Sequence, residues 1–175
     1  MDKRLYKNLR IDTIRAAWID YSNGVFFVTI CTNHKAHLFG EIHGTQMHYS
    51  RIGLMASECI NEIERHHPEA KVLNAVVMPN HVHLLLHVEW HPSDNSCDIV
   101  PNNPMAEVAN RKGRCSTIVS LFKGSVTRKA HQNGIPFAWQ RGFYDYVVRS
   151  QDELAQIYDY ISNNVVRWAT DCYNK

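Results

Sequence analysis

Two histidines separated by one residue, His81 and His83, occur within the hydrophobic stretch VVMPNHVHLLLHVEW, residues 76–90. This composition is typical of a strand. Alternate side chains of a strand share a face, so both imidazoles point the same way, about 7 Å apart along the strand. Neutral imidazoles bind metal ions, and the pair could share one ion. A pair of hydrogen-bonded histidines at a strand end is the alternative. His87 is expected on the same face of the strand but lies further along it from the pair.

Hydrophobic periodicity predicts the elements that must position these histidines. The expected order is a strand at 24–32, a short extended segment with a glycine turn at 36–50, a helix at 50–69 with Ser50 as N-cap, two extended runs within 71–90 split by MPN, a helix at 116–134, a strand from about Phe143 and a helix at 151–171. The fold class is predicted as α+β and ferredoxin-like, a mainly antiparallel sheet with helices packed on one face.

The last predicted helix has an apolar stripe that includes Tyr158, which is therefore expected in the core. Residues 91–114 are polar and rich in proline and asparagine, which predicts a flexible loop. With 175 residues, the chain is long enough for one domain with a proper core. We therefore expect a single domain over residues 1–175.

Composition excludes some classes of protein. Hydrophobic residues make up 45% and charged residues 21%, which is ordinary for a globular protein. No apolar run approaches the roughly 20 residues that span a bilayer, and the charged N-terminus lacks a signal-peptide core. A cytoplasmic protein with no membrane partner is expected. The five cysteines are scattered, which argues against a cysteine zinc site.

Positive charge is concentrated in one part of the chain, although the net charge is only +2. Such a segment could follow a phosphate backbone or simply form a solvated surface. Against the single acid Asp145, the segment between 111 and 149 contains eight basic residues: Arg111, Lys112, Arg114, Lys123, Arg128, Lys129, Arg141 and Arg149.

Five blocks of sequence resemble the REP-associated tyrosine transposases, a branch of the single-tyrosine HUH transposases of the insertion-sequence type. The HUH signature is histidine, bulky hydrophobe, histidine. The resemblance covers roughly residues 18–171, with the blocks in the same order and at similar spacing. These blocks are MPNHVHLLL, YSNGVFFVTICT, STIVSLFKGSVTRK, WQRGFYDYVVRSQDEL and IYDYISNNVVRWATD.

The resemblance implies a metal-assisted DNA strand transesterification, with a tyrosine nucleophile and a 5′-phosphotyrosine intermediate. In the family the nucleophile lies on the helix after the last strand, four residues before an amide metal ligand. Tyr160 and Asn164 match that pattern, with His81 and His83 as the other ligands of Mg²⁺ or Mn²⁺. Tyr144, in the preceding strand, is the alternative nucleophile.

The implied DNA partner is a single strand with a REP-like hairpin, and a homodimer is one option. Residues matching the basic and aromatic positions are assigned to DNA contacts: Lys123, Arg128, Lys129, Trp139, Arg141 and Arg149.

Three other interpretations stay open. A non-catalytic hairpin-binding protein derived from a transposase would keep the fold without the chemistry. A histidine phosphoesterase needs two paired histidine motifs, and the chain shows one. A zinc-stabilised domain would lack suitable cysteine ligands.

Overall fold

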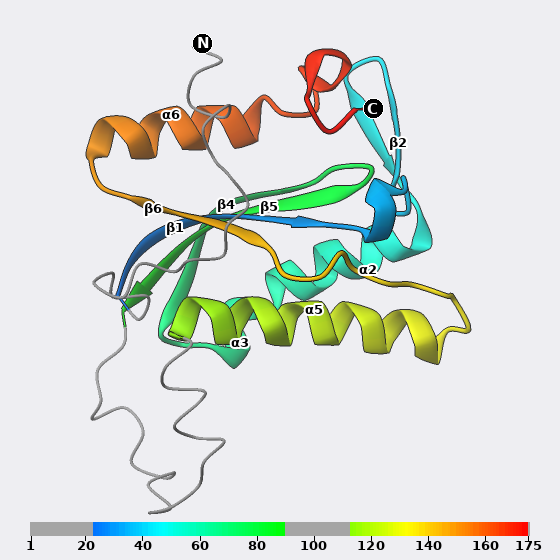
Figure 1. Ribbon diagram of the computed structural model, residues 1–175, viewed down its shortest axis with the longest axis horizontal. Helices are drawn as coiled ribbons and strands as arrows, with labels where there is room; N and C mark the ends of the chain where they lie inside the picture. Colours follow the sequence, from blue (N-terminus) through cyan, green and yellow to red (C-terminus); the bar gives the residue numbers. More distant parts are fainter. Residues whose placement is uncertain (1–22, 90–112, 175) are drawn as a thin grey trace, which may run out of the picture.

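The computed structural model describes residues 23–89 and 113–174 (Figure 1). Within these ranges no helix is long and apolar enough to cross a membrane. The predicted loop at 91–114 falls almost entirely outside them. The strands are β1 (Asn23–Cys31), β2 (Gly40–His43), β3 (Gln46–Tyr49), β4 (Ala70–Val77), β5 (His81–Glu89) and β6 (Tyr144–Val148), and the helices are η1 (Asn33–Lys35), α2 (Arg51–Asn61), α3 (Ile63–His66), α5 (Arg114–Gln132), α6 (Gln151–Ser162) and η3 (Trp168–Thr170).

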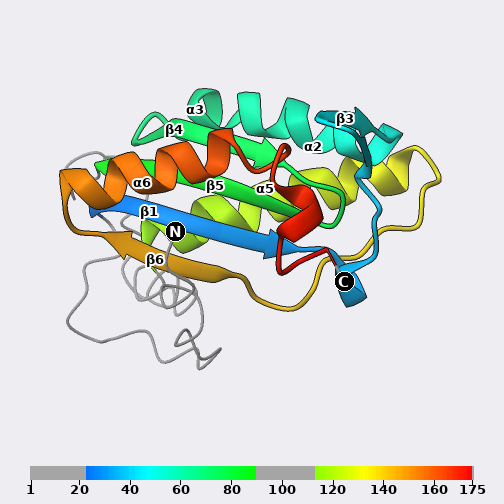
Figure 2. The same ribbon diagram turned by 90° about the horizontal axis from the view of Figure 1, so that it is seen from above.

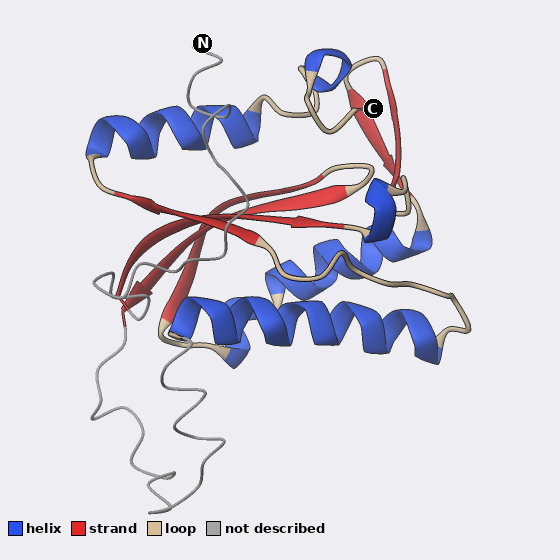
Figure 3. Cartoon of the chain, viewed as in Figure 1, coloured by secondary structure: helices blue, strands red, loops and turns tan. Residues whose placement is uncertain are grey.

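Four strands form one antiparallel sheet in the order β4-β5-β1-β6. With α2 after β1 and α5 after β5, this is the βαββαβ order of a ferredoxin-like fold. Strands β2 and β3 form a separate hairpin inserted before α2. The helix α2 begins at its predicted N-cap, since Ser50 Oγ accepts the Gly53 N–H at 3.1 Å. The α+β class with an antiparallel sheet is confirmed (Figure 3).

The expectation that helices pack on one face holds for α2 and α5 and is wrong for α6. Helices α2, α3 and α5 lie below the sheet in Figure 1, and α6 lies above it. Seen from above, α6 lies over the sheet (Figure 2). Residues on alternate positions of the central strands supply an apolar face to each side. Phe26 and Leu84 belong to the α2–α5 core, whereas Phe27 and Leu85 pack with Ile161 of α6.

The last helix is shorter than predicted. It ends at Ser162, and a series of turns leads to η3 instead of a continuous helix to residue 171. Ile161 is the single buried residue of α6. Tyr158, expected in the core, is 47% exposed, because α6 packs on the sheet through the Leu154, Ile157 and Ile161 side of its surface.

Candidate active site

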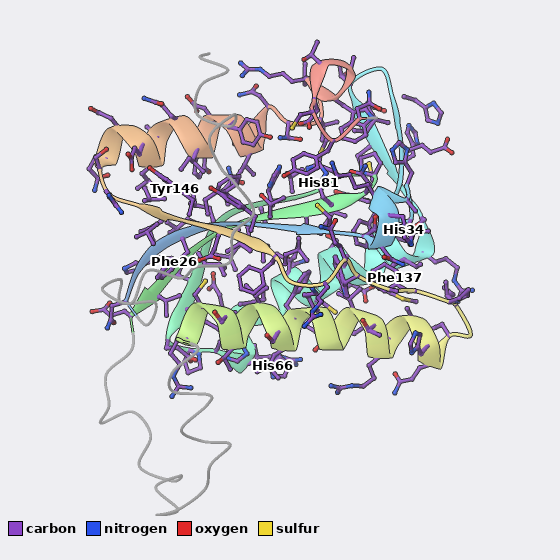
Figure 4. All side chains as sticks on the ribbon, viewed as in Figure 1. Phe26, His34, His66, His81, Phe137 and Tyr146 are labelled. Carbon is purple, nitrogen blue, oxygen red and sulfur yellow. The ribbon has the colours of Figure 1, made fainter. Side chains whose placement is uncertain are left out.

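His81 and His83 project from β5 toward α6, on the face of the sheet that also holds Leu85. Figure 4 shows His81 on the side of the sheet that carries α6, and Phe26 on the other side. Both histidines are buried, at 0% and 1% exposure. Their Nε2 atoms lie 3.0 Å apart. The predicted shared face is therefore correct, and the two rings meet.

The neighbouring Asn80 determines which ring nitrogen of His81 carries the proton. The Asn80 amide nitrogen donates to the carbonyls of Lys35 at 3.2 Å and Tyr173 at 2.8 Å. Its Oδ1 therefore faces His81 Nδ1, 2.8 Å away, and can only accept. Burial and the adjacent His83 lower the pKa of His81 well below its usual value. The neutral ring thus carries its proton on Nδ1 and has a lone pair on Nε2.

His83 is held from its other side. Its Nδ1 lies 2.9 Å from Thr29 Oγ1 on β1, and its Nε2 faces His81 and Tyr160. Burial lowers the pKa of His83 to about 3, although the Val28 carbonyl opposes the shift. His83 is therefore also neutral near pH 7.

Two neutral imidazoles thus bring their Nε2 atoms to 3.0 Å from each other, close enough to bind one cation together. Two neighbouring ligands at about 2.1 Å from one ion, at right angles, are about 3.0 Å apart. Hydrogen bonds that orient the far side of each imidazole are typical around metal-binding histidines. The pair therefore fits a divalent ion. Among the described residues no three His, Cys, Asp or Glu side chains form such a site.

Tyr160 on α6 meets this pair. Its hydroxyl lies 3.5 Å from His83 Nε2, and the two ring centroids are 5.4 Å apart. The ring of Phe27 on β1 packs edge-on against Tyr160, with 6.1 Å between centroids. Tyr144, the alternative, pairs with Thr29 on the neighbouring strand and lies on the same face of the sheet. The structure records a histidine contact for Tyr160.

Asn164 lies in the turn after α6, two residues beyond the helix end, so Tyr160 and Asn164 do not share one continuous helix as predicted. Its side chain is 1% exposed, and neither Oδ1 nor Nδ2 has a hydrogen-bond partner in the described structure. A buried amide without partners costs about 1–3 kcal/mol. The chain places it between Tyr160, which contacts His83, and Trp168, which contacts His81. A buried side-chain amide without hydrogen-bond partners fits the role of a metal ligand.

The segment 168–173, here called the C-terminal segment, covers the histidines. The Tyr173 ring lies 4.5 Å from the His81 ring and the Trp168 ring 6.0 Å from it. Lys35 Nζ sits 4.8 Å above the Tyr173 ring. Lys35 has a left-handed backbone with φ of 53°, a strained conformation often found at functional sites. None of these contacts was predicted from the sequence. Asn80, whose amide donates to the Tyr173 carbonyl, directly precedes the histidine motif, and this position was the one sequence feature that could have indicated its role.

The predicted DNA contacts separate into two groups. Lys123 donates to the carbonyls of Gln140 and Gly142, Lys129 pairs with Glu58 and Glu62, and Trp139 packs in an aromatic cluster and donates to the Lys123 carbonyl. These three side chains already hold the fold together. Arg128, Arg141 and Arg149 are exposed. Helix α5, which carries Lys123, Arg128 and Lys129, lies across the sheet from α6, which carries Tyr160 (Figure 1).

Comparison with known proteins gives the class and then the family. The fold is shared with a tyrosine transposase. The chain superposes on the solved structure of a REP-associated tyrosine transposase bound to a REP hairpin with a TM-score of 0.55 and 20% identity, covering 84% of this chain and 69% of that one. No protein-family model matches the sequence. The chain belongs to the family of an uncharacterised protein from Haemophilus influenzae, which is 34% identical over 164 residues, 91% of this chain and 90% of the relative.

Proposed function

We propose that the protein is a transposase that cleaves and rejoins single-stranded DNA next to a hairpin, through a tyrosine nucleophile and a divalent metal ion. The observation that carries this proposal is the convergence of three groups from two elements. The Tyr160 hydroxyl lies 3.5 Å from His83 Nε2, which lies 3.0 Å from His81 Nε2. A phenol beside a pair of unprotonated imidazoles suits phosphodiester transesterification. The transposase of the same fold that binds a REP hairpin supports a hairpin substrate.

His81, His83 and Asn164 would hold Mg²⁺ or Mn²⁺, the amide oxygen suiting these oxygen-preferring ions. When bound, the ion would polarise the scissile phosphate as a Lewis acid. The chain's own residues do the rest. Asn80 and Thr29 fix the rings, so that each Nε2 points to the site. Phe27 positions the Tyr160 ring, and the phenol oxygen attacks phosphorus to form the 5′-phosphotyrosine and release a 3′-hydroxyl.

On this proposal residues 1–175 work as one HUH domain. A DNA substrate is consistent with the cytoplasmic location expected from the sequence. The exposed arginines, Arg128, Arg141 and Arg149, would contact phosphates. Such contacts add affinity without reading sequence.

The test is incubation with labelled single-stranded DNA that carries a hairpin, with Mn²⁺ or with chelator. We expect a covalent adduct that survives denaturation, requires Mn²⁺ and disappears in Tyr160→Phe. The matched control is Tyr158→Phe, the same change on the exposed surface of the same helix, which should leave the adduct intact. An adduct that persists in Tyr160→Phe and disappears in Tyr144→Phe would move the nucleophile to β6.

One observation favours a second candidate, a non-catalytic hairpin-binding protein. The histidines are 0% and 1% exposed beneath the C-terminal segment, so a phosphate reaches them only if this segment moves. On that alternative the same DNA binds with unchanged affinity in Tyr160→Phe, and no adduct forms under any condition. Gel-shift and adduct measurements on one set of hairpins separate the two candidates.

A further inference from the structure

A bulge in β4 places two consecutive side chains on the α6 side of the sheet. The pairing of β4 with β5 is regular up to Val72 and resumes at Asn74, so Leu73 is an extra residue opposite β5. Leu73 packs against the cluster beneath α6, and Asn74 lies opposite Leu85 of that cluster. Without the extra residue, strand alternation would turn Asn74 toward α2 and α5, because Val72, two residues earlier, packs in their core.

Asn74 uses its whole side-chain amide to join the edge of the sheet to the last turn of α6. Its nitrogen donates to the Tyr158 carbonyl at 3.1 Å and to Ser162 Oγ at 2.8 Å. Its oxygen accepts the N–H of Ala75 at 2.8 Å. Exchanging the two amide atoms would set a donor against the Ala75 N–H and an acceptor against the Tyr158 carbonyl, so the contacts determine this orientation.

The two α6 groups that Asn74 binds lie on either side of Tyr160 in the sequence. Tyr158 is two residues before it, and Ser162, the last residue of the helix, is two residues after it. The Tyr160 ring packs against the same apolar cluster as Leu73. The bulge and Asn74 together therefore hold the turn of the helix that carries Tyr160.

We propose that Asn74 is a positioning residue, which together with the bulge at Leu73 sets the placement of Tyr160 against the histidine pair. This inference rests on the proposed transposase function and adds to it a residue on a third element, β4. Asn74 is assigned no contact with DNA or metal. It acts through the last turn of α6, to which its amide nitrogen donates.

Helix α6 is tied to both outer strands of the sheet. The strand order β4-β5-β1-β6 places β4 and β6 at the edges. Near the start of the helix, Glu153 accepts the Tyr146 hydroxyl of β6 at 3.1 Å. In its last turn, the Tyr158 carbonyl accepts from Asn74 of β4. Of the two anchors, Asn74 is the one that holds the end of the helix where Tyr160 lies.

The helix needs a directional anchor because little of it is buried. Ile161 is its single buried residue, and the cluster beneath it has two further buried members, Phe27 and Leu85. Apolar contacts are non-directional, so they hold the helix on the sheet but resist sliding weakly. Hydrogen bonds are directional and fix its position. Attack on a phosphodiester depends on placement at this scale, since an error of about 1 Å can cost about 100-fold in rate.

The test compares Asn74→Asp with the matched control Asn61→Asp, the same change at the exposed last residue of α2. Aspartate keeps the acceptor for Ala75 but cannot donate to α6. Both changes add a negative charge near the carboxyl end of a helix. We expect adduct formation at saturating DNA and Mn²⁺ to slow about 10–100-fold in Asn74→Asp, with the dissociation constant for the hairpin unchanged. Asn61→Asp should match the wild type in both quantities.

Ser162→Ala is a milder change that serves if Asn74→Asp does not fold. It removes one of the two acceptors on α6, and we expect adduct formation to slow about 2–10-fold, as loss of one hydrogen bond does. In the Asn74→Asp background, Ser162→Ala should cause no further loss, because the hydrogen bond that it removes is already absent. Rate losses that simply multiply would overturn the role of this hydrogen bond.

A fluorinated tyrosine at position 160 reports its placement without relying on activity. We expect its fluorine NMR resonance to shift in Asn74→Asp and in Ser162→Ala, and to stay unchanged in Asn61→Asp. An unchanged resonance in Asn74→Asp, a wild-type rate in that variant, or a loss of hairpin affinity that accounts for the slower rate would each overturn the proposal.

The two proposals fail in different ways. If the wild type forms no adduct, the proposed transposase function fails, and the fluorine resonance still decides whether Asn74 places Tyr160. If the wild type forms the adduct and Asn74→Asp equals it, only the positioning role of Asn74 fails.

Discussion

The two faces of the sheet differ in what the same strands bury. On the face toward α2 and α5 the buried side chains of the two central strands are apolar, with Val28, Ile30, Val82 and Leu84 in one continuous core. The face toward α6 has a small apolar cluster and then a group of buried polar side chains. That group comprises Thr29, His81, His83 and Asn164. One face therefore stabilises the fold, and the other uses burial to hold imidazoles neutral and an amide unsatisfied.

The largest difference between the two faces is expected in the free energy of unfolding, when one core leucine on each face is replaced by alanine. Leu84 and Leu85 are both 0% exposed, but Leu84 belongs to the large core and Leu85 to the cluster beneath α6. We expect Leu84→Ala to lower the free energy of unfolding by about 3–5 kcal/mol and Leu85→Ala by about 2–3 kcal/mol. Urea unfolding measures both values.

Adduct formation per folded molecule should show the reverse order. Leu85→Ala loosens the surface on which α6 and Tyr160 rest, so its rate should fall, whereas Leu84→Ala should keep the wild-type rate. Equal rates in the two variants would show that α6 is positioned by something other than this cluster.

Lowering the pH should destabilise the metal-free protein, because His83 on the face toward α6 is held neutral only in the folded state. The pKa of His83 is about 3 in the folded state and about 6.5 when unfolded, so between these values the unfolded chain binds a proton that the folded protein excludes. The stabilisation is complete above pH 6.5 and is lost as pH falls. For His83 this amounts to about 2 kcal/mol between pH 8 and pH 5.

Urea unfolding in chelator, across this pH range, checks the prediction. His83→Gln should lose that part of the pH dependence. His87→Gln, the same change on the same strand and face, should keep it. A wild-type protein equally stable at pH 8 and pH 5 would contradict the neutral, buried state of His83.

Replacing Asn164 should change stability and metal binding in opposite directions. Replacing its unpartnered amide by the similarly shaped Leu removes a buried polar group with no hydrogen bond. We expect Asn164→Leu to raise the free energy of unfolding by about 1 kcal/mol in chelator and to weaken Mn²⁺ binding about 10–100-fold, as loss of a ligand contact does.

Calorimetric titration with Mn²⁺ and urea unfolding in chelator together check both effects. Asn163→Leu, one residue earlier and exposed, is the control and should leave Mn²⁺ affinity unchanged. A marked loss of stability in Asn164→Leu without metal would show that the amide has a structural partner instead.

Sequence patterns predicted the parts of this arrangement that depend on local periodicity. Alternation along β5 placed His81 and His83 together, and Ser50 was recognised as the cap of α2. The face covered by α6 was not predictable in this way, because strands buried on both sides show continuous rather than alternating hydrophobicity. The C-terminal segment had no local signal either, because the contact of Tyr173 with His81 depends on the end of α6 at Ser162 and on the turns that follow.

The smallest expected effect concerns which face the DNA follows. Arg149 lies at the turn that leads into α6, while Arg128 is exposed on α5 across the sheet. If the DNA backbone follows the face of Tyr160, Arg149→Ala should weaken hairpin binding a few-fold and reduce the salt dependence by about one phosphate contact. Arg128→Ala should change neither quantity. Equal losses in both variants, measured by fluorescence anisotropy at several salt concentrations, would mean that the DNA contacts both layers, because one face of the sheet could not then explain the footprint.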